Sequence, residues 1–580
     1  MSGGYEMTAS EGGIRPLRGI PMMEAALGDC EAKVGKALAD LKKRDVPRRI
    51  WARDHTVWKP EPAEISNRLG WLIVAEAIRD KLSGARKLAL ELKEEGCERV
   101  LLLGMGGSSL APEVLSKTFG PREGWPVLDV LDSTDPEAVL SRAESLDPAR
   151  TLFLVSTKSG GTVETLSFFK FFHNRALEAL GAREAGRRFA AVTDPGSKLA
   201  DLAGQLGFRK VFLNDPDIGG RYSALSYFGL VPAALMGLEP SHLVDNAMEM
   251  ISRCRGAFGM VDTDPAVRLG AIMGALAREG RDKLTLVVSP AVASLGDWVE
   301  QLVAESTGKE GKGVLPVVGE PLGEPDVYGA DRFFVHIGLA GEDERDAALE
   351  ALVRAGHPVV RLCMEDFFCL GGQFFLWEMA TVVASHMLGI NPFNQPNVES
   401  AKVQARKMVA AYLEKGELPR SEPSREFEGV QVYGRVQGSC PTEALDRFAE
   451  WASSGAYMAL QAYLPPSSRV DEALEALRVR LRDKYRLAVT TGYGPRFLHS
   501  TGQLHKGDAG RGLFVQITAD SPRDAPIPDE PGGETASMTF GVLEEAQAAG
   551  DRQALLDAGR SVLRFHLTGD VVDGLRKLTG

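Results

Sequence analysis

The fold is decided by residues 100–110, Val-Leu-Leu-Leu-Gly-Met-Gly-Gly-Ser-Ser-Leu, and by residues 151–165, Thr-Leu-Phe-Leu-Val-Ser-Thr-Lys-Ser-Gly-Gly-Thr-Val-Glu-Thr. In each, an apolar run long enough for a buried strand ends in a loop of glycine, serine and threonine, and a helical pattern follows. Such loops suit phosphate, because backbone N–H groups at a helix start are unpaired and the helix dipole favours an anion. Either loop alone could be only a tight turn. Together they predict a small phosphorylated ligand held by a parallel α/β sheet.

The composition excludes several classes of protein. At 580 residues the chain is too long for one core and indicates two or three domains. The formal net charge of −12, without a basic block, argues against nucleic acid as the main partner. No signal peptide is evident, and no apolar run reaches the roughly 18 residues of a membrane span. The six cysteines lack metal-site spacing, so we expect a cytoplasmic protein with reduced thiols, no metal and no membrane contact.

Alternating strand and helix patterns organise the chain. Residues 1–96 are expected to form a loose tail (1–18) followed by helices (22–96), and 97–255 and 256–417 to form two doubly wound parallel sheets, the second repeating the first. After a Pro/Glu/Ser linker at 418–426, strands and helices intermingle over 425–580, which favours an α+β domain. The expected strands are 100–103, 127–131, 151–155, 189–192, 210–213, 283–288, 333–337, 358–363, 457–464, 487–490, 512–518 and 561–567, with long helices near 294–308, 371–389, 469–483 and 538–558.

Three further segments carry groups suited to chemistry on a small anion. Arg221 follows a Gly-Gly pair whose backbone can approach a ligand closely, and its guanidinium can neutralise a developing charge. Gln301 and Glu305 share one face of a helix whose other side is apolar. Such a carboxylate is partly desolvated and suited to base chemistry near neutral pH. Lys402 lies in the second turn of a helix that follows a Pro-bracketed turn. The plainer readings are a surface arginine, a solvated glutamate and an exposed lysine.

Two of the nine histidines fall in one polar loop. His499 and His505 lie among hydroxyl and amide side chains within residues 496–507. Clustered imidazole, hydroxyl and amide groups indicate sugar handling or acid–base chemistry, although a loop histidine satisfied by its neighbours remains an alternative. His336, within an expected strand, and His386, within an expected helix, are interpreted as structural.

Taken together, these segments resemble phosphoglucose isomerases, which are built from sugar-isomerase (SIS) domains. The order of the motifs matches over roughly residues 50–415. Residues 104–109 are similar to the GIGGS motif, 157–165 to S-K-[ST]-x-T-T-x-E-T with Gly161 in place of threonine, 219–223 to GGR-[FY]-S, 301–309 to Q-x3-ES-x-GK, and 391–402 to N-P-F-D-Q-P-x-V-E-x2-K with Asn394 in place of aspartate. Residues 492–507, GYGPRFLHSTGQLHKG, resemble the isomerase half of fused transaldolase–phosphoglucose isomerases, here in a free-standing version.

One departure from the family pattern concerns a histidine. Phosphoglucose isomerases carry a ring-opening histidine in an L-H-S-x-G-Q context shortly after the ES-x-GK helix, whereas residues 310–332 contain no histidine. The nearest equivalent here is 498–503, in the third domain. We infer that this domain supplies the missing histidine as His499, with His505 as the alternative.

The resemblance implies interconversion of glucose 6-phosphate and fructose 6-phosphate without a cofactor, in a homo-oligomer expected to be a dimer. Glu305 would move the proton between C2 and C1 through a cis-enediol, Arg221 would stabilise the enediolate, and His499 and Lys402 would assist ring opening. The substrate-binding residues would be Gly107, Ser108, Thr157, Lys158, Ser159, Thr162 and Gln301.

Three alternatives to this function stay open. Gly104-x-Gly106 suggests a dinucleotide-dependent oxidoreductase, but Ser109 replaces the third glycine and the second hydroxyl-rich loop is then unexplained. The second alternative is a related aldose–ketose isomerase that also accepts mannose 6-phosphate. The third is a SIS protein that binds sugar phosphates without activity.

Overall fold

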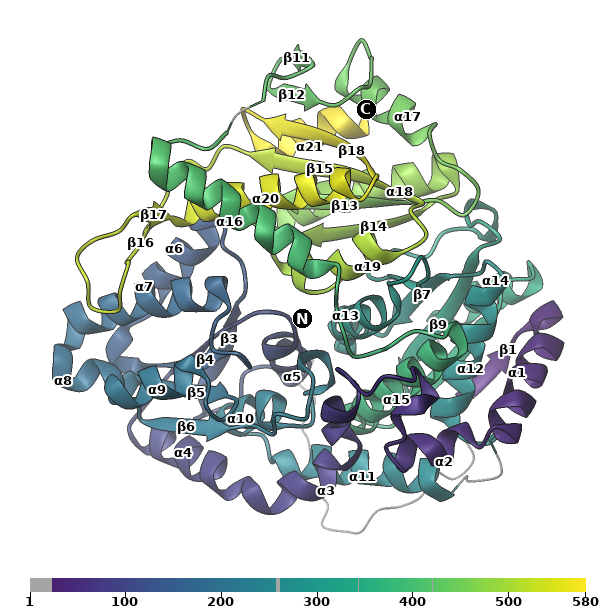
Figure 1. The fold of residues 1–580 in the computed structure, drawn as a ribbon, viewed down its shortest axis with the longest axis horizontal. Helices are drawn as coiled ribbons and strands as arrows, with labels where there is room; N and C mark the ends of the chain where they lie inside the picture. Colours follow the sequence, from purple (N-terminus) through teal and green to yellow (C-terminus); the bar gives the residue numbers. More distant parts are fainter. Residues whose placement is uncertain (1–22, 257–260, 343, 420) are drawn as a thin grey trace.

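Three large sheets with helices packed around them, together with a two-stranded sheet of β16 (Pro526–Ile527) and β17 (Met538–Thr539), make up the described part of the molecule (Figure 1). The computed structural model describes residues 23–256, 261–342, 344–419 and 421–580, so the tail expected at 1–18 lies outside the described residues. The first sheet occupies the lower left of Figure 1, the second the right, and the third the top. All the strands expected from apolar runs are present, most of them within one or two residues of the expected bounds.

The first unit is an all-parallel sheet with the strand order β3-β2-β4-β5-β6. Its strands are β2 (Arg99–Gly104), β3 (Val127–Leu131), β4 (Thr151–Ser156), β5 (Phe189–Thr193) and β6 (Lys210–Leu213). The connecting helices are α5 (Leu110–Phe119), α6 (Pro136–Ser145), α7 (Val163–Leu180) and α9 (Lys198–Gln205), with α4 (Ser83–Glu94) and α10 (Tyr227–Leu235) packed together beside them. The central strands are buried along almost their whole length, because helices cover both faces of a doubly wound sheet.

The second unit has the order β1-β10-β9-β7-β8, in which the last four strands are parallel. These are β7 (Lys283–Val288), β8 (Leu315–Val317), β9 (Arg332–Leu339) and β10 (Val359–Met364), with helices α12 (Pro265–Arg278), α13 (Leu295–Thr307), α14 (Asp346–Arg354) and α15 (Leu370–Leu388). The expectation of helices throughout 22–96 is wrong at its start, where β1 (Met23–Ala26) pairs antiparallel with β10. Its Met-Glu-Ala-Ala sequence favours a helix, so pairing at the sheet edge overrides local propensity.

The third unit corrects the expected α+β class. Its strands β13 (Tyr457–Tyr463), β14 (Ala488–Tyr493), β15 (Gly512–Ala519) and β18 (Ser561–Leu567) are mutually parallel, and only β12 (Val430–Tyr433) and β11 (Arg425–Phe427) are antiparallel. The helices α18 (Ser468–Tyr485) and α20 (Phe540–Asp557) separate strands in the chain, and such crossovers allow neighbouring strands to run parallel. The third unit is therefore an α/β domain with an antiparallel edge.

One strand order recurs in all three units. Numbered along the chain within each unit, four parallel strands lie in the order 2-1-3-4: β3-β2-β4-β5, β8-β7-β9-β10 and β14-β13-β15-β18. The repetition expected for the first two units is therefore present in their strand order, and the third unit shares it. In such sheets ligands bind outside the carboxyl ends of strands 1 and 3, where the order reverses.

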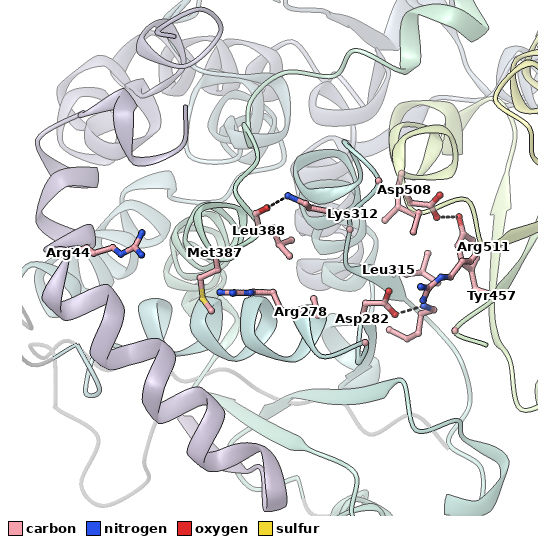
Figure 2. Close-up of a pocket in the computed structure, with 18 residues that line it drawn as sticks. Arg44, Arg278, Asp282, Lys312, Leu315, Met387, Leu388, Tyr457, Asp508 and Arg511 are labelled. Atoms are coloured by element: carbon pink, nitrogen blue, oxygen red, sulfur yellow. Dashed lines mark hydrogen bonds and ion pairs between the residues drawn. The ribbon is translucent and has the colours of Figure 1, made fainter. Parts of the chain in front are cut away.

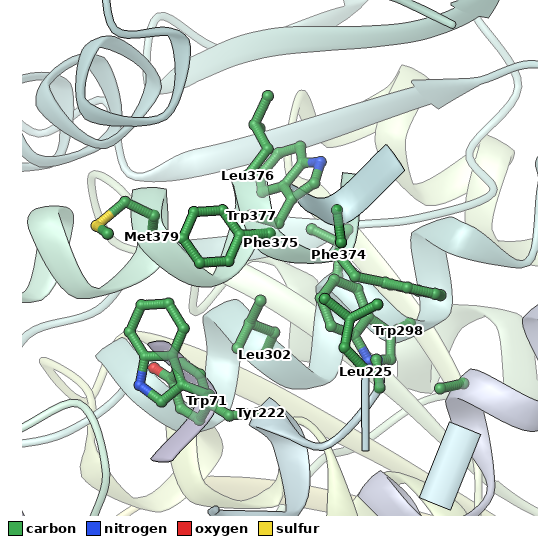
Figure 3. Close-up of a cluster of buried hydrophobic side chains, with 14 of the residues drawn as sticks. Trp71, Tyr222, Leu225, Trp298, Leu302, Phe374, Phe375, Leu376, Trp377 and Met379 are labelled. Atoms are coloured by element: carbon green, nitrogen blue, oxygen red, sulfur yellow. The ribbon is translucent and has the colours of Figure 1, made fainter. Parts of the chain in front are cut away.

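A buried hydrophobic cluster joins the first and second units and supports α13 (Figure 3). Trp298 of α13 packs edge-on against Phe374 of α15, with ring centroids 4.8 Å apart. By length and composition Phe367–Leu388 could cross a membrane, contrary to our expectation, but 83% of its apolar 18-residue window is buried within the structure. Its apolar surface is thus used for packing against α11 (Pro240–Gly256), α12 and α13.

Candidate active site

The two hydroxyl-rich loops lie side by side at the carboxyl ends of β2 and β4. These strands are neighbours, with Gly104 opposite Ser156, and they are strands 1 and 3 of the first unit. Ser156 Oγ donates to the carbonyl of Ser108 at 3.0 Å, which joins the loops. Thr157 and Thr162 share a hydrogen bond of 3.1 Å between their hydroxyl oxygens. The loops predicted from the sequence are therefore brought together at the point where such folds bind ligands.

A cavity of about 520 Å³ opens beside the second loop. Ser159 and Thr162 line it together with Lys402, which is exposed on α16 (Val398–Lys415). Lys158 turns away, because its ammonium group binds Asp194 and the carbonyl of Pro216. Of the cations proposed from sequence, Lys402 thus faces the cavity and Lys158 is held by the neighbouring loop.

Glycine is required where the first loop meets the rest of the site. Gly106 has a positive φ of 54°, and a Cβ there would lie 2.8 Å from Gln301 Nε2 and 3.1 Å from His499 Cβ. At Gly107 a Cβ would lie 2.1 Å from the carbonyl oxygen of Gly220, next to Arg221. The bare backbone therefore allows three segments to converge on one loop.

The predicted base, Glu305, lies in a buried polar cluster on α13. Its Oε2 is 3.3 Å from Arg221 Nη1 and accepts a hydrogen bond of 3.3 Å from Gln301 Nε2. The side chains of Glu305 and Arg221 are only 7% and 5% exposed. The rest of the guanidinium is held by Ser306 Oγ at 2.9 Å and the Pro392 carbonyl at 2.6 Å. Arg221 is thus fixed from several sides, and one of its nitrogens faces the carboxylate.

His499 of the third unit reaches this cluster within the same chain. Its carbonyl accepts a hydrogen bond of 2.7 Å from Gln301 Nε2, and its Nε2 is 3.0 Å from Oε1 of Glu164, at the start of α7. Burial opposes ionisation of Glu164, but the charge and hydrogen bond of His499 outweigh it and lower the pKa of that carboxyl. Gln547 of α20 donates to the same oxygen at 2.7 Å. The histidine is therefore oriented by a carboxylate.

The segment that carries His499 is anchored to both other units. Arg496 forms ion pairs with Glu113 and Asp132 of the first unit. Burial would raise the pKa of Glu113, but the Arg496 guanidinium outweighs it and lowers that pKa to about 2. On the other side, Gln503 donates to the carbonyl of Gly308 at 2.9 Å, at the end of α13. These contacts place the histidine between the first and second units.

The alternative histidine, His505, does not line this cavity. It is buried among aromatic rings, with centroids 5.0 Å from Phe514 and 6.3 Å from Tyr457. Burial, followed by the charges of Lys506 and Arg560, lowers its pKa well below the ordinary value. With so low a pKa, the His505 imidazole is neutral near pH 7. It is also not among the residues that line the cavity.

Glu164 and Arg496 are functional groups to which the sequence analysis gave no role. Glu164 was part of the quoted loop motif, and its position one residue into a helix after the hydroxyls is the signal that could have singled it out. Arg496 carries no such signal, because its partners Glu113 and Asp132 come from a distant part of the chain.

The fold and the site define an aldose–ketose isomerase of phosphorylated sugars. Residues 92–310 match the model of the phosphoglucose isomerase family. The glucose-6-phosphate isomerase of Rubrobacter xylanophilus is 30% identical over 374 residues, 56% of this chain and 85% of that protein. That of Parabacteroides distasonis is 28% identical, over 58% of this chain and 85% of its own.

Solved structures agree with this assignment at the level of the fold. A hypothetical protein from Thermus thermophilus superposes with a TM-score of 0.58 and 25% identity, covering 67% of this chain and all of that one. A glucose-6-phosphate isomerase from Chlamydia trachomatis gives 0.57 at 16% identity, over 68% of this chain and 89% of its own. This chain belongs to the phosphoglucose isomerase family, which sets aside the oxidoreductase alternative.

Proposed function

We propose that this protein interconverts glucose 6-phosphate and fructose 6-phosphate in a site completed by its own third unit. The observation that carries the proposal is the contact of Gln301 with both Glu305 and the backbone of His499, which joins the predicted base to the predicted ring-opening acid. Family membership supports a sugar-phosphate substrate. A cytoplasmic location fits the six free cysteines.

Substrate phosphate would bind at the two loops. Ser159 and Thr162 offer hydroxyls to the cavity, and the backbone at Gly107–Ser108 and the Thr157 hydroxyl lie behind them. Lys402 would add a positive charge from the opposite wall. Because this phosphate does not react, its contacts position the sugar and contribute mainly uniform binding.

Ring opening would use the His499–Glu164 pair. A carboxylate that accepts from one ring nitrogen fixes the orientation of the imidazole. His499 would give a proton to the ring oxygen as the bond from that oxygen to C1 breaks, and the proton of the C1 hydroxyl would pass to solvent. Lys402, which lines the same cavity, would stabilise the negative charge that develops on that hydroxyl oxygen.

Glu305 would then take the proton from C2 of the open chain and return it to C1. The resulting cis-enediolate carries negative charge beside Arg221, whose guanidinium is already fixed by Ser306 and Pro392. A donor held in place before the reaction costs no reorganisation when the charge develops. Gln301 donates hydrogen bonds to both Glu305 and the His499 carbonyl, and it would hold the base in a fixed position relative to the sugar.

The proposal is tested by a coupled isomerase assay on glucose, mannose and glucosamine 6-phosphates. We expect turnover of glucose 6-phosphate, and a His499→Ala variant that is impaired on the cyclic sugar far more than on substrate already in the open-chain form. Comparable turnover of mannose 6-phosphate would widen the substrate class. Absence of turnover on all three, in a protein that still binds them, would favour the non-catalytic alternative.

A further inference from the structure

A second cavity, of about 750 Å³, lies between the second and third units and shares no residue with the one beside His499 (Figure 2). Its walls come from α1 (Glu31–Lys43) and its C-terminal Arg44, the end of α12, the loop after α13, and the segments around Tyr457 and Asp508 of the third unit. A volume of this size is in the range of small-molecule sites.

Basic side chains from four separate segments converge on this cavity. Arg44, Arg278, Lys312 and Arg511 all line it, and they are labelled in Figure 2. Within the described part of the chain, no carboxylate lies within 4 Å of Arg278, Lys312 or Arg511. The ammonium group of Lys312 donates to the Leu388 carbonyl, at 2.7 Å.

The acidic groups of the cavity are already satisfied. Asp282 is ion-paired with its neighbour Lys283. Asp508 accepts a hydrogen bond of 2.8 Å from the Tyr457 hydroxyl and lies 3.0 Å from Arg560. Beyond the cavity wall, Glu279, next to Arg278, pairs with Lys33 at 2.7 Å.

The cavity side chains without an ion-pair partner among the described residues, Arg278, Lys312 and Arg511, are therefore all positively charged, in a chain whose formal net charge is −12. Unpaired guanidinium groups in a concave site match phosphate oxygens in geometry and charge. Tyr457, Leu315, Met387 and Leu504 add apolar surface between the cations. A compound with several phosphate charges and a modest apolar body fits this lining better than an apolar or cationic one.

We propose that this cavity is a binding site for a multiply charged phosphate compound, distinct from the site that binds the sugar phosphate. Because Arg278 and Lys312 belong to the second unit and Arg511 to the third, an anion bound here bridges the two units. Binding to the folded protein alone then raises its thermal stability, by an amount that grows with the logarithm of the ligand concentration once that concentration exceeds Kd.

The test is calorimetric titration of the full-length protein with inorganic pyrophosphate, in a Ser159→Ala/Thr162→Ala background that weakens anion binding at the first cavity. We expect saturable binding that weakens at least tenfold when Arg278→Gln and Arg511→Gln are added. Arg354→Gln, which removes an exposed guanidinium from α14 that pairs with Glu350 at 3.5 Å, is the control for the loss of a surface positive charge and should leave the affinity unchanged.

A shift of the unfolding temperature with pyrophosphate should follow the same pattern in the same set of variants. The proposal is overturned if pyrophosphate does not bind to the Ser159→Ala/Thr162→Ala protein, or if Arg354→Gln weakens binding as much as the cavity variants do. It is also overturned if Arg278→Gln/Arg511→Gln leaves the affinity unchanged.

Discussion

Arg221 and Glu305 form a buried ion pair, and neither charged group can be solvated by water in place of its partner. Breaking such a pair strands a charge away from water, which commonly costs several kcal/mol. Substitutions at Glu305 must therefore keep the shape and hydrogen bonding of the side chain if they are to report on proton transfer. Glutamine meets this requirement, because its amide oxygen can still accept from Arg221.

Glu305→Gln should lower kcat at least 100-fold, the usual loss when a general base is removed, and leave the affinity for 6-phosphogluconate near wild type. Steady-state kinetics and calorimetry measure the two quantities. Glu310→Gln, five residues along and half exposed, is the matched control. A Glu305→Gln enzyme with half the wild-type turnover would remove this residue from proton transfer.

Ser159→Ala combined with Thr162→Ala should raise KM for the phosphorylated sugar roughly tenfold or more and change kcat little, because contacts to a non-reacting phosphate stabilise ground and transition states alike. Both hydroxyls line the cavity beside Lys402. Initial-rate measurements separate the two constants. An unchanged affinity for 6-phosphogluconate in the double variant would show that the phosphate binds elsewhere.

The helix α15 is buried along most of its length and contains a carboxyl group without a hydrogen-bond partner in the part of the chain that the structure describes. Glu378 is fully buried in this helix, and neither carboxylate oxygen has a hydrogen-bond partner within the described chain. Burial raises the pKa of Glu378 well above its ordinary 4.5. In the unfolded chain it ionises near pH 4.5, so above that pH the folded state holds a proton that the unfolded state has lost. The free energy of unfolding is therefore unaffected by Glu378 below about pH 4.5, and it declines as the pH rises above that value, because only the unfolded chain releases the proton.

Glu378→Gln should consequently stabilise the protein relative to wild type, and the gain should grow from pH 5 to pH 7.5 by up to about 1.4 kcal/mol per pH unit. Urea unfolding at the two pH values measures the difference. Glu350→Gln, an exposed glutamate on α14, should show no such trend. An equal effect of Glu378→Gln at both pH values would mean that this carboxyl titrates alike in the folded and unfolded states.

The strands were predictable from sequence because each is an apolar run bounded by turn residues, as at 127–131 and 283–288. The missed strands are short: β8 has three residues, and β1 has a helix-favouring sequence that is decided by its partner. The class of the third unit was wrong because parallel pairing depends on which strands meet, and no local pattern encodes that.

The candidate site residues were predictable where the functional side chains belong to a short sequence motif, as Arg221, Gln301 and Glu305 do. What could not be predicted is pairing between motifs, such as Glu164 with His499 across 335 residues. The turn of Lys158 toward Asp194 is likewise a tertiary effect that no local signal encodes.

At the scale of the whole molecule, the third unit closes a site that the other two leave open. Arg496 anchors it to the first unit and Gln503 to the second, while α16 and α20 pack closely because Gly550 has no side chain facing Ala405. Lys402 on α16 and His499 after β14 thus reach one cavity in the same chain. In the proposed site all the named groups therefore come from one chain, while a dimer stays an expectation from the family resemblance.

The central claim, that His499 acts within its own chain, is tested most directly by complementation between two inactive variants. Glu305→Gln and His499→Ala chains are purified separately, then unfolded and refolded together, and the isomerase activity of the mixture is compared with that of each variant treated alone. Refolded wild-type protein is the reference for recovery.

We expect the mixture to be no more active than the average of the two separate variants, because each chain then lacks one essential group of its own catalytic site. Recovery of a substantial activity, about a quarter of the wild-type value if chains pair at random in a two-fold dimer, would contradict it. That result would show that His499 serves the Glu305 of a partner chain.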